Sequence, residues 1–138
     1  MDEERIVLRG ESNSPVVVSR SEFRGEARLD VRRYFYASSG ELVPTKKGVS
    51  LPIANGLAAQ ALEAMRTVKG EAVTLDKGSR PVVIQWMTFK GRRMLDIRSY
   101  YTDDAGELQP TQKGVALPED QGLPETVIAA MEKSLAGA

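Results

Sequence analysis

The chain has 138 residues, of which 41% are hydrophobic and 28% charged, and its 19 Lys and Arg balance its 19 Asp and Glu to give zero net charge. This composition is typical of a globular protein, it argues against indiscriminate binding of nucleic acid, and no apolar run approaches the roughly 20 residues that span a bilayer. The lack of Cys and His excludes disulfides and thiolate metal sites and removes the commonest general base, so we expect no cofactor and no enzyme.

An internal repeat organises the chain. Residues 29–52 recur as residues 95–118, with an offset of 66 residues and no gap. The Leu, Asp, Arg, Tyr, Gly-Glu-Leu, Pro-Thr, Lys-Gly-Val and Leu-Pro of the first copy all return in place. A match of this length indicates a duplication, with repeats at residues 1–70 and 71–138. Because one such half buries little core alone, we expect the two halves to pack together.

Short β-prone runs, several rich in Val and Ile and separated by turn residues, predict four strands in each half. The strands are expected at residues 5–9, 15–23, 27–36 and 41–51, and again at 71–75, 81–89, 93–102 and 107–117. Polar residues 10–14 and 76–80 are expected to form turns. A Gly follows Phe23-Arg and Phe89-Lys, where a tight hairpin would reverse the chain.

The third and fourth strands carry further local signals. In the third strand, Leu29 and Val31 should point to one face and Arg32 to the other. Pro44 and Pro110 interrupt the fourth strand, so we expect an edge, a bulge or a bend there.

After the fourth strand the apolar residues change to helical spacing in both repeats, which predicts one amphipathic helix per repeat. The apolar stripes are Leu57, Ala61, Leu62, Met65 and Val68, and Leu123, Val127, Ile128, Met131 and Leu135. The sequence therefore predicts an α+β fold made of two ββββα repeats.

Three motifs occur in the same order in both repeats. They are Phe-Lys/Arg-Gly, then Leu-Asp-Ile/Val-Arg-x-Tyr-aromatic, then Gly-Glu-Leu-x-Pro-x-x-Lys-Gly-Val-x-Leu. In this order the chain resembles the transcriptional positive-cofactor-four family of coactivator-type, single-stranded-DNA-binding domains. The resemblance implies a curved four-stranded antiparallel sheet and a helix in each copy, with dimerisation through the helices and facing channels for single-stranded DNA. A tandem copy then implies an intramolecular pseudo-dimer.

The resemblance also implies which side chains contact nucleic acid. They are hairpin aromatics that stack on bases, an aromatic of each third strand, and cations of the hairpins and of the third and fourth strands. These are Phe23, Arg24, Arg32, Phe35, Lys46 and Lys47 in the first repeat, and Phe89, Lys90, Arg92, Arg98, Tyr101 and Lys113 in the second. We expect Lys46 and Lys47 to make the first repeat the better-charged surface. Glu26 and Gln112 stand at cationic positions of the other copy, and Val43 and Gln109 replace a lysine usual in the family. Fewer cations predict weaker binding than in a typical member.

Structural interpretations compete with these roles. A Phe at a hairpin is commonly a core plug, although its duplication beside a cation favours stacking. Trp86 occurs once and falls on the face opposite Phe89, so we assign it to the core. Tyr34 and Tyr100 are expected to be structural, with hydroxyls that find partners.

Asp30 and Asp96 are expected to orient arginines by ion pairing, and Gly48 and Gly114 to mark a bulge. Arg32 and Phe35 are three residues apart, so an ideal strand places them on opposite faces. Either the strand bulges or twists near Tyr34, or Phe35 lies at a rim.

Basic residues concentrate in the repeated segments, where 20–50 holds seven Lys and Arg against four Asp and Glu, and 80–116 holds six against four. The alternative is a solvated surface of mixed charge. Our first hypothesis is a non-enzymatic protein that binds single-stranded DNA with little sequence preference, in transcription regulation, replication, recombination or repair. RNA stays open as a ligand.

A second hypothesis is a protein-interaction module that keeps the fold but has lost DNA binding, with transcription or replication proteins as partners. We expect no membrane association and an intracellular location, cytoplasmic or nucleoid in a bacterium or phage. The pseudo-dimer is either monomeric or part of a higher homo-oligomer.

Overall fold

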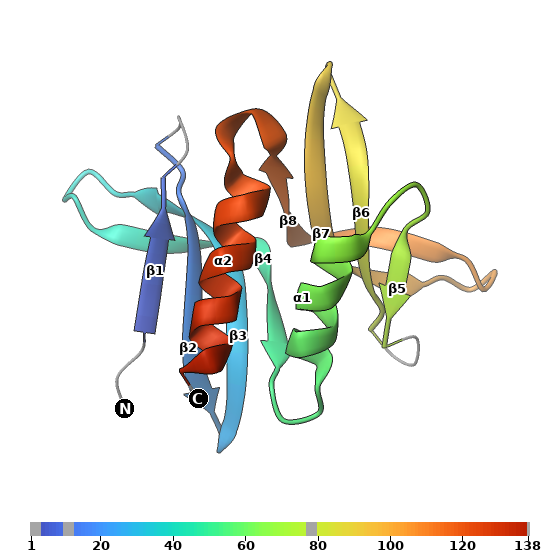
Figure 1. Ribbon diagram of the computed structural model, residues 1–138, viewed down its shortest axis with the longest axis horizontal. Helices are drawn as coiled ribbons and strands as arrows, with labels where there is room; N and C mark the ends of the chain where they lie inside the picture. Colours follow the sequence, from blue (N-terminus) through green and yellow to red (C-terminus); the bar gives the residue numbers. More distant parts are fainter. Residues whose placement is uncertain (1–3, 10–12, 77–79, 138) are drawn as a thin grey trace.

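The computed structural model describes residues 4–9, 13–76 and 80–137. In chain order its elements are β1 (Glu4–Leu8), β2 (Val16–Phe23), β3 (Glu26–Tyr36), β4 (Leu42–Pro52), α1 (Leu57–Thr67), β5 (Val73–Leu75), β6 (Val82–Phe89), β7 (Arg92–Thr102), β8 (Leu108–Pro118), the 3-10 turn η1 (Glu119–Gln121) and α2 (Leu123–Ala136). The predicted α+β fold of two ββββα repeats is confirmed (Figure 1). The turns expected at 10–14 and 76–80 lie largely outside the described residues.

The strands form two separate antiparallel sheets, ordered β1-β2-β3-β4 and β5-β6-β7-β8. The predicted strand limits hold to within a residue or two, because the Val-rich runs and the turn residues beside them fix each strand locally.

Both β2–β3 and β6–β7 hairpins close with two-residue turns. Arg24 and Gly25 have φ angles of 53° and 78°, and Lys90 and Gly91 have 52° and 77°. Two consecutive positive φ values are typical of a type I′ turn, whose twist matches that of the strands. The predicted tight hairpins are confirmed, and each places a cation at its tip.

A bulge interrupts the β3–β4 pairing, and another interrupts the equivalent β7–β8 pairing. The register shifts between Arg32 and Tyr34, and again between Arg98 and Tyr100. Gly48 permits the bulge, because a Cβ on it would lie 2.6 Å from Arg32 Cβ and 2.7 Å from the main-chain oxygen of residue 31. The arginine side chain therefore crosses directly over the glycine backbone, and the expected bulge is confirmed.

Each helix packs against the sheet of the other repeat, and the two repeats share a single core. α2 lies against β1 and β2 of the first sheet, and α1 lies against β5 and β6 of the second as well as against β4 (Figure 1). All five apolar positions predicted for the first helix are buried, whereas Ile128 and Leu135 of the second stripe are half-buried. Trp86 packs on the core but stays partly exposed, with the Arg93 guanidinium 4.0 Å above its ring.

Polar contacts also join the two repeats. Arg20 of β2 donates a hydrogen bond to the main-chain oxygen of Ser134 in α2, at 3.1 Å. Arg66 of α1 pairs with Glu132 of α2 and with Glu63 of its own helix. The hydrogen bond to Glu132, and then that to Glu63, raise the pKa of Arg66.

This packing predicts that the two repeats unfold together. Met131 of α2 is fully buried, so Met131→Ala should lower the free energy of unfolding by about 2–5 kcal/mol. The unfolding transitions in urea, followed by far-UV circular dichroism and by Trp86 fluorescence, should shift by the same amount, although Trp86 lies in β6 of the second sheet and α2 packs mainly against the first. A fluorescence transition left unmoved by the substitution would contradict the shared core.

Candidate nucleic-acid interface

Each sheet has an outer face, which we define as the face turned away from the helices. Directly paired strand residues share a face, and the register places Phe23, Ser21, Ser19 and Val17 of β2 beside Glu26, Arg28, Asp30 and Arg32 of β3. The corresponding face of the second sheet carries Phe89, Met87, Gln85 and Val83 beside Arg92, Met94, Asp96 and Arg98. The hairpin aromatic and the strand arginine of each repeat therefore lie on the same face.

The hairpin aromatics are open to solvent. Phe23 is 60% exposed and Phe89 is 59% exposed, so neither ring is a core plug. The Arg24 guanidinium lies 5.1 Å from the Phe23 ring centre, and the Lys90 ammonium lies 5.4 Å from that of Phe89. Each tip thus presents an aromatic plane with a cation beside it, which is the combination that single strands require.

The strand arginines are held rigidly. Arg32 donates two hydrogen bonds to Asp30, at 3.1 and 2.9 Å, and one to the main-chain oxygen of Thr45 at 2.9 Å. The same three bonds, at the same distances, fix Arg98 to Asp96 and to the main chain of Thr111. The predicted ion pairs are confirmed. A guanidinium has five N–H donors, so each arginine keeps two for another acceptor.

The tyrosines next to the bulges are structural, as predicted. Tyr34 is only 5% exposed, and the Arg5 guanidinium lies 5.6 Å from its ring centre. Tyr100 is half-buried, and its hydroxyl accepts a hydrogen bond from Gln85 Nε2 at 3.1 Å.

Phe35 and Tyr101 lie beyond the bulges, near the ends of β3 and β7. They are 44% and 50% exposed and pair with Val43 and Gln109. Each stands roughly 10 Å along the strand from the anchored arginine of its repeat.

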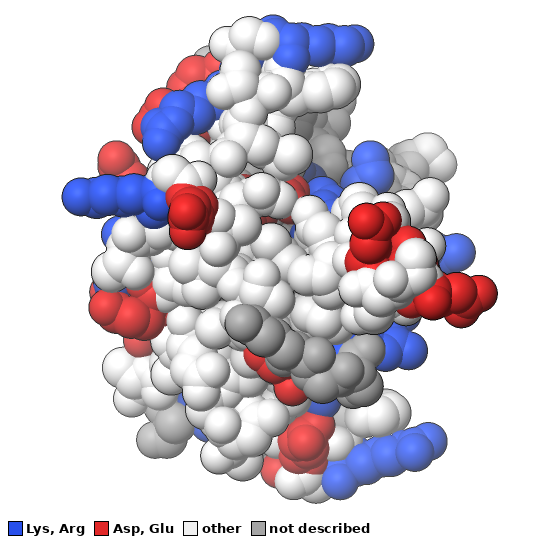
Figure 2. All heavy atoms as spheres, turned by 90° about the vertical axis from the view of Figure 1, so that its right-hand side faces the viewer, with Lys and Arg blue, Asp and Glu red and all other residues white. Residues whose placement is uncertain are grey.

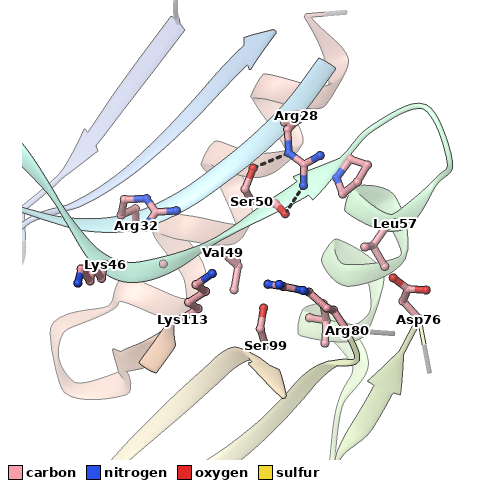
Figure 3. Close-up of a pocket in the computed structure, with 13 residues that line it drawn as sticks. Arg28, Arg32, Lys46, Val49, Ser50, Leu57, Asp76, Arg80, Ser99 and Lys113 are labelled. Carbon is pink, nitrogen blue, oxygen red and sulfur yellow. Dashed lines mark hydrogen bonds between the residues drawn. The ribbon is translucent and has the colours of Figure 1, made fainter. Parts of the chain in front are cut away.

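Two clefts lie where β4 and β8 approach each other. Cleft 1, of about 490 Å³, holds five cations and one carboxylate, Asp76 (Figure 3). Cleft 2, of about 520 Å³, holds four cations. The cations of cleft 1 are Arg28, Arg32, Lys46, Arg80 and Lys113, and those of cleft 2 are Arg33, Lys47, Arg92 and Arg98.

Each cleft draws cations from both repeats. Lys46 lines cleft 1 and its neighbour Lys47 lines cleft 2, while Lys113 of the second repeat reaches cleft 1. Lys46 therefore shares cleft 1 with Arg32 while Lys47 lies in cleft 2, because successive strand residues point to opposite faces.

Several cations are already paired. Arg92 donates two hydrogen bonds to Asp120, at 3.0 and 2.7 Å, which lowers the pKa of that carboxyl. Burial, and then the like charge of Arg92, lower the pKa of Arg33. Arg28 is bound by Glu26 and by Ser50.

Three cleft residues were missed from the sequence: Arg28, Arg33 and Arg80. Their equivalents 66 residues away are Met94, Ser99 and Ser14. The shared motifs single out only what both copies keep, so they gave no signal for these positions.

Outside the clefts the charge is mixed. Figure 2 shows the end of the molecule that carries the second sheet, where cations and carboxylates are scattered around a largely uncharged surface. Among the residues that the structure describes, no group of His, Cys, Asp or Glu could hold a metal ion. None of the described helices is long and apolar enough to cross a membrane.

A comparison with protein families agrees with this geometry. The family described as Transcriptional Coactivator p15 (PC4) matches residues 11–55 and 79–122, one segment in each repeat. The chain belongs to this family. Two PC4 segments in one chain confirm the tandem arrangement expected from the repeat.

Among solved structures, the chain is similar to the bacteriophage T5 homolog of the eukaryotic transcription coactivator PC4, a protein implicated in recombination-dependent DNA replication. The identity is 30%, the match covers 46% of this chain and 73% of the phage chain, and the TM-score is 0.41. No curated protein gives a significant match.

The close crossing of Arg32 over Gly48 generates a prediction. Gly48→Ala should lower the free energy of unfolding by about 1–3 kcal/mol, because the new methyl group overlaps the arginine and the adjacent main chain. Gly137→Ala is the matched control, since its φ of −75° is allowed and its nearest neighbour lies 3.6 Å from the built Cβ. Denaturant unfolding of both variants checks this, and equal stability would contradict it.

Proposed function

We propose that this PC4-family protein binds single-stranded DNA along the outer faces of its sheets, with little sequence preference. The observation that supports this most is the duplicated pairing of an exposed hairpin phenylalanine with a cation, on the same face as an arginine anchored by aspartate. The two repeats, 1–70 and 71–138, would act as one unit.

The chemistry of single strands matches these parts. Unpaired bases expose π-faces, and stacking on an aromatic ring contributes about 1–3 kcal/mol per base whatever its identity. Phosphates accept hydrogen bonds from guanidinium groups whose orientation is already fixed. The contacting residues proposed are Phe23, Arg24, Arg32, Phe35, Lys46 and Lys47, and Phe89, Lys90, Arg92, Arg98, Tyr101 and Lys113.

Such a protein would act without a cofactor, in transcription regulation or in DNA replication, recombination or repair. RNA is a second possible strand, because a stacking platform does not inspect the 2′-hydroxyl.

The second candidate function is a protein-interaction module with weak DNA binding. The pairing of Arg92 with Asp120 favours it, together with Glu26 at the equivalent position of the first repeat. Both features remove positive charge from the outer faces.

Aromatic exchange at the hairpin tips tests the first function. Phe23→Ala combined with Phe89→Ala should weaken binding of a labelled single strand by about 1–3 kcal/mol for each base unstacked, measured by fluorescence anisotropy. Phe→Tyr at both positions keeps the ring plane and should keep the affinity, whereas Phe→Leu keeps only an apolar side chain and should not.

The exposure of both rings means that none of these variants should alter thermal unfolding. Equal affinity of the Ala and Tyr variants, or equal binding of single-stranded and duplex DNA by the unmodified protein, would contradict the proposal. A stoichiometric protein partner in place of DNA binding would support the interaction module.

A further inference from the structure

The two clefts are related by the repeat but differ in chemistry. Residues 28, 32, 46, 48, 49, 50 and 52 line cleft 1, and the residues 66 positions later line cleft 2. On the opposite wall, Ser99 and Lys113 of the second repeat line cleft 1, whereas their counterparts Arg33 and Lys47 line cleft 2. A serine in one cleft thus replaces an arginine in the other.

Arg33 links the two repeats within cleft 2. Its guanidinium donates hydrogen bonds to the main-chain oxygens of Ser14, at 2.5 Å, and of Ala116 in the other repeat, at 3.3 Å. Both terminal nitrogens of the Arg33 side chain are therefore already hydrogen-bonded, one of them across the contact between β3 and β8.

Asp120 engages Arg92 of cleft 2, and Asp96 engages Arg98 in the same way as Asp30 engages Arg32 of cleft 1. Of the four cations of cleft 2, Lys47 is the one whose side chain has no hydrogen-bond or ion-pair partner among the described residues.

In cleft 1 the position that corresponds to Arg33 is occupied by Ser99. Ser99 leaves room there, and Figure 3 shows the side chains of Arg80 and Lys113 pointing toward one another across the space beside it. In the described parts of the chain, no carboxylate lies within ion-pair distance of Arg80, Lys113 or Lys46. Like charges that converge from two elements repel unless an anion lies between them.

We propose that the chain binds one strand of DNA rather than two, and that it does so through cleft 1, with a backbone phosphate held between Arg80 and Lys113. Lys46 and the two remaining N–H donors of Arg32 lie further along the same cleft. The strand would enter from the Phe23 hairpin, which shares its face with Arg28 and Arg32. This inference rests on the proposed function and adds which surface binds and with what stoichiometry.

A matched pair of lysine substitutions tests the inference. Lys113→Gln in cleft 1 should weaken binding of a labelled oligothymidylate of about ten nucleotides by roughly five- to tenfold, and should reduce the log–log salt slope by about 0.7. Lys47→Gln, at the equivalent position of cleft 2, should weaken binding less than Lys113→Gln does. Arg80→Ser, which copies Ser14, should behave like Lys113→Gln.

A substitution that copies Arg33 into cleft 1 gives an independent readout. Ser99→Arg should place a side chain across the position proposed for the phosphate, and should weaken binding by about tenfold or more while the melting temperature stays within a few degrees. Titration of the unmodified protein at concentrations far above Kd should saturate at one strand per chain.

Equal losses from the two lysine substitutions, or saturation at two strands per chain, would overturn the inference and leave the proposed function intact. Failure of the unmodified protein to prefer single-stranded over duplex DNA would instead remove the proposed function itself.

Discussion

The packing of each helix against the sheet of the other repeat is the constraint on which the rest of the structure depends. Each helix covers apolar residues of the other repeat's sheet, so neither half can bury its core without its partner. This packing brings β4 and β8 side by side and builds each cleft from both repeats. The proposed binding surface is therefore a property of the pseudo-dimer and not of a single repeat.

Fusion of two copies in one chain allows the halves to diverge. In a homodimer every change appears twice, whereas here Arg33 and Ser99 occupy equivalent positions with different consequences. The Arg33 guanidinium donates hydrogen bonds to main-chain oxygens of both repeats, whereas the short side chain of Ser99 lines cleft 1. One cleft can then serve assembly while the other keeps its cations for a ligand.

Much of the fold could be predicted because its determinants are local. The hairpins follow from a Gly after Phe23-Arg and Phe89-Lys, and the helices from their apolar stripes. The pairing of Arg32 with Asp30 was also within reach, since residues two apart on a strand share a face. The cleft composition was not, because the residues of the second repeat that join Lys46 in one cleft and Lys47 in the other are decided only once the two sheets are packed. Arg80 corresponds to Ser14 in the first repeat, so the motifs shared by the two repeats gave no signal for it.

The central claim is that stacking rings and cleft cations together select single strands. Its most direct test is the affinity of the unmodified protein for single-stranded and duplex DNA of equal length across a salt series. We predict tighter binding of the single strand at every salt concentration, with a slope of about −0.7 for each phosphate neutralised and a substantial residual affinity at high salt from stacking. Equal affinities for the two forms, lost together as salt rises, would contradict the account.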